Sequence, residues 1–282
     1  MKQRTAAQKR LLIIVFCALI LLLGLLVWQG VRRGDAARVG IPHSVSAAGA
    51  AMLLQSPGAQ YSCVVGSTAQ ALAEALEKGD LDAALLPADL ALSLTGVRIR
   101  AAVGYAPLVI LSDDPEIRVL QDLEGRALTL DERLQNTRED RALRALLRAA
   151  EVRCAIAYGP AGDPFACSLD TAAGLDAPIC FSLSKAWRQN LSSLPPAGLC
   201  LAVREDYLAH AGTDFAAFER ALKSAMSYAA DKRKKAVAMT AAAGLAPDED
   251  TADRLYPFCD FVYLTGAELN AALQAGRGER AF

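Results

Sequence analysis

The body of the chain alternates short apolar runs with stretches of helical spacing. Residues 38–42, 60–66 and 81–87 are predicted to be buried strands, and residues 44–56 and 67–80 are predicted to be the helices between them. The second helix has Ser67 or Thr68 as its N-cap and Gly79 at its end. Apolar strands that alternate with helices are typical of a parallel sheet covered on both faces.

The second half of the chain repeats this pattern. Strands are predicted at 126–131 and 154–159, a helix at 141–153, and a loop with a short helix at 162–174. The stretch "LDAALLP" at 81–87 has a counterpart in "LDAPICFSL" at 175–183, where Leu-Asp-Ala again precedes an apolar run. We interpret these two stretches as the third strand of two equivalent α/β lobes. Two such lobes would face each other across a cleft lined by loops at the carboxyl ends of the strands, where open α/β sheets bind ligands.

The last third of the chain is predicted to be mostly helical, with a final strand and helix over 261–274. An apolar stripe in its first long helix indicates core packing, and it consists of Phe215, Phe218, Leu222, Met226 and Ala229. The fold class is therefore α/β with two lobes. The expected division is a leading segment 1–35, a first lobe from 36–111 completed by 198–282, and a second lobe from 112–197.

The leading segment has the composition of a membrane anchor or export signal. Residues 11–28 carry no charge, and as a helix they would extend about 27 Å, close to the thickness of a bilayer's hydrocarbon core. The basic residues before them predict that this end stays in the cytoplasm and that the body is exported. The helix either remains as an anchor in the cell membrane or is cleaved to release a secreted form. A lipid-modified Cys17 is a poorer explanation, because Phe16 stands where a small residue is needed.

Net charge and cysteine content bear on whether the protein binds nucleic acid, forms disulfides or holds a metal. The net charge of −1 gives no electrostatic reason to expect nucleic acid as a partner. Six cysteines lie beyond the leading segment, and they either form disulfides in an oxidising compartment or serve as small buried side chains. No CxxC motif occurs, and the chain has only two histidines, His43 and His210, so no metal site is expected.

Four stretches together resemble the type II periplasmic binding proteins, more narrowly the solute-binding components of ABC importers for nitrate, sulfonates, taurine and thiamine precursors. They are "VGIPHSVSA" at 39–47, "VVGSTAQALAEALEKGDLDAALLPADLA" at 64–91, "DLEGRALTL" at 122–130 and "YPFCDFVYLTGAELNAAL" at 256–273. The resemblance covers about residues 38–275, and the second stretch is its most specific part. It implies a monomeric, hinged receptor without a cofactor. The lobes would close over a small polar solute, and the closed form would dock on an ABC permease and its ATPase.

The resemblance implies a ligand site in the loops at the strand ends. The candidate ligand-binding residues are His43, Ser44, Ser46, Ser67, Thr68, Pro87, Asp89, Tyr105, Asn136, Thr137, Ser182 and Trp187. Neighbouring candidates at the same ends are Ala88, Gly104, Arg133, Gln135, Gly159 and Ser184. Hydroxyls near helix N-termini suit an anionic solute, although the role of helix cap explains each of them more simply. Asp89 instead suits an amine-bearing solute or caps its own helix, and the sequence leaves this conflict open.

Two other functions compete with solute import. A membrane-anchored sensor or accessory domain of the same fold would use the lobes to contact a partner. An enzyme on this fold would need placed acid–base or nucleophilic groups, and His43 is the only histidine near a cleft loop. We therefore expect a binding protein rather than an enzyme.

Overall fold

The computed structural model describes residues 36–55, 60–210 and 212–275. Residue 36 closes a leading unit, and residues 37–282 form a second compact unit, which contains all the elements below. The predicted membrane helix at 11–28 lies outside the described residues. Among the helices of the described part, none is long and apolar enough to cross a membrane.

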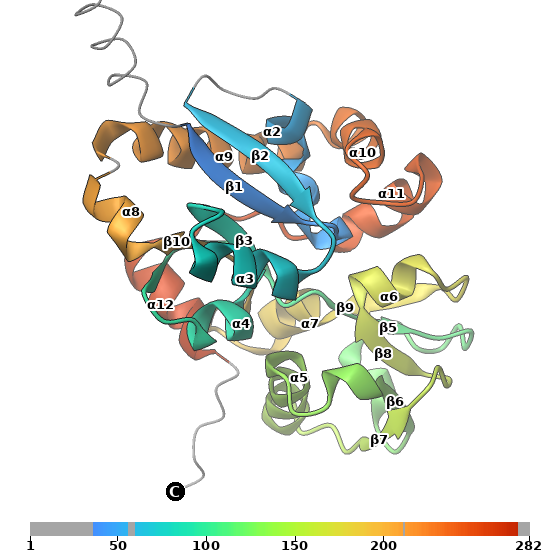
Figure 1. Cartoon of the computed structure of the whole chain (residues 1–282). Helices are drawn as coiled ribbons and strands as arrows, with labels where there is room; N and C mark the ends of the chain where they lie inside the picture. Colours follow the sequence, from blue (N-terminus) through green and yellow to red (C-terminus); the bar gives the residue numbers. More distant parts are fainter. Residues whose placement is uncertain (1–35, 56–59, 211, 276–282) are drawn as a thin grey trace, which may run out of the picture. The chain divides into compact units, whose positions relative to one another are not determined.

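Two five-stranded sheets carry the fold (Figure 1). The first contains β1 (Ala37–Pro42), β2 (Tyr61–Gly66), β3 (Ala83–Pro87), β4 (Val97–Tyr105) and β10 (Ala197–Arg204). The second contains β5 (Leu108–Leu111), β6 (Ala127–Asp131), β7 (Ala155–Gly159), β8 (Phe165–Ser168) and β9 (Ile179–Ser182). We call the parts built on these sheets the first and second lobes.

Helices occupy the connections and the C-terminal third. The α-helices are α2 (Ala51–Gln55), α3 (Ala69–Lys78), α4 (Ala88–Ser93), α5 (Arg138–Ala149), α6 (Leu169–Ala173), α7 (Leu183–Asn190), α8 (Glu205–His210), α9 (Gly212–Asp231), α10 (Arg233–Ala242), α11 (Glu249–Leu255) and α12 (Gly266–Gln274). Four short 3-10 helices join them: η1 (Val45–Ala50), η2 (Leu120–Leu123), η3 (Glu132–Leu134) and η4 (Tyr256–Phe258).

The two sheets have the same topology. The strand orders are β2-β1-β3-β10-β4 and β7-β6-β8-β5-β9. In each sheet the first three strands are parallel and the last two pair antiparallel with their neighbours. The counterpart of β3 is therefore β8, and the counterpart of β1 is β6. The predicted parallel pairing holds for the first three strands, while the two antiparallel strands, which were not expected, make both sheets mixed.

The proposed equivalence of the two Leu-Asp-Ala stretches was wrong. The second stretch forms β9, an edge strand antiparallel to β5, and it begins only at Ile179, after Pro178. Proline cannot donate a ladder hydrogen bond, which keeps this stretch at an edge. The true third strand is the four-residue β8, inside a segment predicted to be loop and short helix. The predicted last strand is reduced to a single bridge between Ala102 and Leu264, and the predicted helix at 44–56 begins as η1.

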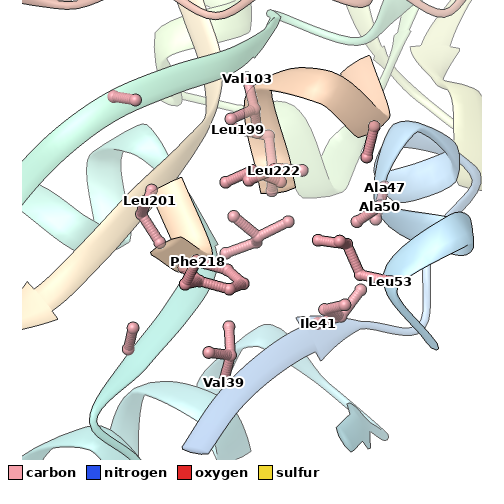
Figure 2. Packing of buried hydrophobic residues seen from close by; sticks show 14 of the residues in the cluster. Val39, Ile41, Ala47, Ala50, Leu53, Val103, Leu199, Leu201, Phe218 and Leu222 are labelled. Carbon is pink, nitrogen blue, oxygen red and sulfur yellow. The ribbon is translucent and has the colours of Figure 1, made fainter. Parts of the chain in front are cut away.

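Each lobe has its own apolar core. In the first, the inward side chains of β1 meet Leu53 of α2 and the stripe of α9, including Phe218 and Leu222 (Figure 2). All five residues of the predicted stripe are buried. In the second lobe, Leu128 and Leu130 of β6 pack with the apolar face of α5. Burial of these faces, at about 25 cal/mol per Å², is the main force that fixes the sheets under their helices.

Two chain crossings join the lobes. Ala106 and Pro107 connect β4 to β5, and residues 191–196 connect α7 to β10. The Ala106 amide donates to the Pro196 carbonyl at 2.8 Å, so the crossings are bonded to each other. Gly198 follows closely, and a Cβ at this position would lie 2.2 Å from the Tyr105 carbonyl oxygen. Only glycine allows the backbones to approach this closely.

The six cysteines of the described part are free thiols. Cys167 and Cys200 are fully buried, and desolvation raises the pKa of each to about 12. For these two residues, the structure therefore favours the interpretation of cysteine as a small buried side chain.

Candidate functional site

A pocket of about 300 Å³ lies where the carboxyl ends of strands from both sheets meet. Its volume is at the lower end of the range for small-molecule sites, about 300–1,000 Å³. Its lining consists of Pro42, His43, Ser44, Ser46, Thr68, Ala69, Pro87, Pro107, Leu134, Glu139, Ser168, Asp170, Gly198 and Leu199. We call it the interlobe pocket, because β1, β2 and β3 of the first sheet and β8 of the second all end in it.

The structure brings five of the sequence candidates together in this pocket. They are His43, Ser44, Ser46, Thr68 and Pro87. Three of these follow β1, which ends at Pro42 and leads directly into η1. Thr68 is the N-cap of α3, and its hydroxyl accepts from the Ala71 amide at 3.0 Å.

The β8–α6 junction sends a carboxylate across to the loop after β1. The Ser44 hydroxyl lies within hydrogen-bond distance of both carboxylate oxygens of Asp170, at 2.9 and 2.7 Å. The Val45 amide donates to Oδ1 of the same residue at 2.9 Å. Val45 is the first residue of η1 and Ser44 is its N-cap, so Asp170 satisfies an amide that the helix itself leaves open.

At the β3–α4 junction, Asp89 of the first lobe makes the corresponding contact with the second lobe. The Arg138 amide donates to Oδ2 of Asp89 at 3.0 Å, and the Arg138 Nε donates to Oδ1 at 3.0 Å. Arg138 is the first residue of α5, whose N-cap is Thr137. Asp89 does not cap its own helix, because α4 has no side-chain cap. That alternative from the sequence was wrong: Asp89 caps a helix of the other lobe.

These two contacts are topological equivalents. Asp89 and Asp170 are each the second residue of the helix that follows the third parallel strand. Their targets, Arg138 and Val45, are each the first residue of a helix between the first and second parallel strands of the opposite lobe. The lobes are therefore joined by two reciprocal contacts in which a carboxylate accepts from the first amide of a helix, and we call these contacts the cross-lobe caps.

The two cross-lobe caps differ in charge compensation. Asp89 also pairs with the guanidinium of Arg141 at 3.2 Å, while Arg138, with only 2% of its side chain exposed, donates further to the Leu273 carbonyl of α12 at 2.9 Å. Asp170 has hydroxyl and amide donors, and within the described ranges no lysine or arginine forms an ion pair with it. Asp170 nevertheless keeps surface that faces the pocket.

The surroundings of Asp170 shift the pKa of its carboxyl group. Desolvation by the surrounding protein raises the pKa of Asp170, and the hydrogen bonds from Ser44 and Val45 and the nearby His43 oppose the rise. A carboxylate that receives an amide and a hydroxyl is bonded as an acceptor, the pattern of the ionised form. Asp170 is thus a negative group in the pocket wall that forms no ion pair with a lysine or arginine among the described residues.

The other sequence candidates lie outside the lining. Ser67 is exposed beside Thr68. Tyr105 is buried near the crossings, with the Arg188 guanidinium 5.6 Å from its ring centroid. Asn136 and Thr137 precede α5, where Thr137 is the N-cap.

Two candidates of the second lobe, Ser182 and Trp187, stabilise the fold and do not line the pocket. Ser182 is the buried N-cap of α7, and its hydroxyl accepts from the Lys185 amide at 3.3 Å. Trp187 is part of the second core, and its indole donates to the Ser193 hydroxyl at 3.2 Å. Of the neighbouring candidates, Arg133 and Gly159 line a separate hollow with Asp131 and Thr171.

Sequence reasoning missed the two carboxylates of the lining, Glu139 and Asp170. Asp170 lies in a segment predicted to be a loop with a short helix, because the strand before it has only four residues. The available signal was "SLD" after an apolar run, a serine N-cap followed by an acid in the first turn, as α6 shows. Glu139 lies in the first turn of α5, where acids are common for helix stability alone.

Solved structures with a similar architecture include proteins described as solute-binding. A structure described as an ABC transporter from Parabacteroides distasonis matches with a TM-score of 0.67 and 15% identity, over 85% of this chain and 89% of that one. The aliphatic sulphonate binding protein SsuA of Escherichia coli matches with a TM-score of 0.58 and 15% identity, over 86% and 85%. The periplasmic nitrate-binding protein NrtA of Synechocystis matches with a TM-score of 0.56 and 13% identity, over 84% and 75%.

No protein-family profile matches the chain, and no curated protein matches it in sequence. The identities of 13–15% therefore establish the fold and nothing finer. At the level of the fold, the expected likeness to the type II periplasmic binding proteins is confirmed. The chain has the two-lobed α/β fold of ABC-type solute-binding proteins.

Proposed function

We propose that this protein is the extracytoplasmic substrate-binding component of an ABC-type importer, and that it captures a small solute between its lobes. The interlobe pocket carries the proposal, because it combines residues of both lobes at the carboxyl ends of their strands. A ligand that contacts both walls favours the closed arrangement, and differential affinity of this kind is what drives closure.

Two further parts of the proposal rest on the sequence and the neighbours. The apolar segment 11–28 would hold the binding lobes at the outer face of the membrane. The neighbours include a periplasmic sulphonate-binding and a periplasmic nitrate-binding protein, which supports a binding role rather than catalysis and a partnership with a permease and its ATPase.

A thermal-shift screen of the full-length protein tests the binding role. The solute classes are sulfonates, nitrate, carboxylates, pyrimidines and amines. A solute at about one hundred times its dissociation constant should stabilise the protein by about 2.7 kcal/mol, which amounts to several degrees. A folded sample that none of the classes stabilises would contradict solute capture and favour a protein-binding accessory role.

A further inference from the structure

The interlobe pocket offers a ligand two carboxylate acceptors. Its charged or titratable side chains are Asp170, Glu139 and His43, and the described residues of its lining include no lysine or arginine. Three prolines, Pro42, Pro87 and Pro107, also contribute no amide donor.

The hydroxyl groups of the lining are already engaged within the protein. Ser44 bonds to Asp170 and lies 2.5 Å from the Ser46 hydroxyl. Thr68 accepts from the Ala71 amide, and Ser168 accepts from the Thr171 amide at 3.2 Å. An oxyanion that entered the pocket would have to compete with Asp170 for the Ser44 hydroxyl hydrogen, whereas Thr68, which accepts from an amide, keeps its hydroxyl hydrogen.

The cross-lobe caps also remove helix N-termini from the set of anion sites. The first amide of η1 donates to Asp170 and the first amide of α5 donates to Asp89, so the chain's own carboxylates lie where the oxygens of an anionic ligand would bind. The first turn of α3 reaches the lining at Thr68 and Ala69. It supplies about half a positive charge, which is less than one carboxylate.

Apolar surface makes up much of the remaining wall. Leu134, Leu199 and Ala69 contribute side chains from both lobes, in addition to the three prolines. A ligand that matches this wall has an apolar body and one group that donates hydrogen bonds to a carboxylate.

From this distribution, and on the basis of the proposed solute-binding function, we propose that the interlobe pocket takes a small cationic solute, a protonated amine on an apolar body, with Asp170 as the carboxylate that receives the ammonium group and Glu139 as the second negative group of the wall. The ammonium supplies the ion pair that no described lysine or arginine forms with Asp170. Asp89, the acid singled out from the sequence, is occupied by Arg138 and Arg141 and does not serve this role. Nitrate and sulfonates, the solutes named for two of the fold neighbours, are the wrong charge class for this wall.

The test is a headgroup series on one apolar body, measured by calorimetry with the full-length protein. The probes are hexylammonium, hexanol, hexanoate and hexanesulfonate at neutral pH. We expect hexylammonium to bind at least about tenfold more tightly than either anion, because a charge-assisted hydrogen bond is worth at least that ratio. Tighter binding of either anion, or no binding of hexylammonium, would overturn the assignment.

Variants then locate the effect. Asp170→Asn should weaken hexylammonium binding about tenfold, since the amide keeps the shape and removes the charge. The matched control is Asp176→Asn, an exposed acid outside the pocket, which should leave binding unchanged. Glu139→Gln is the second test if Asp170→Asn fails to give the near-UV dichroism of the native fold. An equal loss in the control, or no loss in either pocket variant, would contradict the assignment.

The outcomes separate this inference from the proposed function. If anions bind and the amine does not, solute capture stands and the assignment of charge class fails. If no probe of the series and no class of the wider screen binds, both fail.

Discussion

The two strand–helix junctions that end in Asp89 and Asp170 occupy the same place in two sheets of the same topology, yet their surroundings differ. Asp89 accepts from the Arg138 side chain, which is almost completely buried, and from Arg141. Asp170 accepts from a serine hydroxyl and an amide. The same kind of contact, a cross-lobe cap, can therefore have two roles. Where the charge is compensated, the contact fastens the lobes, and where it is left over, the carboxylate remains available to a ligand.

The largest effect is expected when the guanidinium of Arg138, the partner of Asp89, is removed. Arg138→Met should lower the free energy of unfolding by about 3 kcal/mol, because it leaves Asp89 and the carbonyl of Leu273 without their buried donor. Urea unfolding of the full-length protein measures this. The control is Arg141→Met, whose half-exposed ion pair should be worth less than about 1 kcal/mol. Equal losses in the two variants would contradict the structural role of Arg138.

A smaller effect is expected when each aspartate is neutralised in turn. Asp89→Asn should cost about 1–2 kcal/mol of stability, since its partners are two guanidinium groups. Asp170→Asn should cost less than about 1 kcal/mol, because an amide oxygen can still accept from the Val45 amide. Denaturant midpoints of the two variants give the comparison, and a larger loss for Asp170→Asn would reverse the roles assigned here.

The pH dependence of stability sharpens the comparison further. Desolvation raises the pKa of Asp170 in the folded protein above the usual 3.8, so the folded state holds this proton more tightly than the unfolded state does. The contribution of Asp170 to stability therefore falls as the pH rises from about 3.8 through its folded pKa. Relative to the wild type, Asp170→Asn should gain stability across that interval.

Asp140 provides the opposite case in the same protein. Burial alone would raise its pKa, but hydrogen bonds from Tyr158, the Asn136 amide and Arg144 outweigh this, so the pKa is lowered. Its contribution is present above 3.8 and is lost as the pH falls through the folded pKa. Asp140→Asn should therefore lose stability relative to the wild type on going from acid to neutral pH. Slopes of the same sign for the Asp140 and Asp170 variants would contradict these pKa directions.

The sequence predicted the class of fold and most of the first lobe. The strand and helix at 60–80 follow from local signals, since Thr68 caps α3 and Gly79 ends it with a φ of 82°. His43, Ser44 and Ser46 were found because they directly follow a clear strand, β1. Local spacing and capping decide such elements, so the sequence is sufficient for them.

The second lobe was predicted less well, because its equivalence to the first lies in backbone topology. The match between two Leu-Asp-Ala stretches pointed to an edge strand, while the true counterpart of β3 is a strand of four residues with an unrelated sequence. The role of Asp89 depends on Arg138, which is 49 positions away in the chain. No local pattern contains such a contact, and for the same reason the pocket carboxylate, Asp170, was missed.

A crystal structure of the full-length protein grown with hexylammonium tests most directly whether Asp170 receives the ammonium group. We expect the ammonium nitrogen to lie within about 3 Å of a carboxylate oxygen of Asp170, with Asp89 still bonded to Arg138. An empty interlobe pocket at saturating amine, or a lysine or arginine of the chain bonded to Asp170, would contradict this assignment.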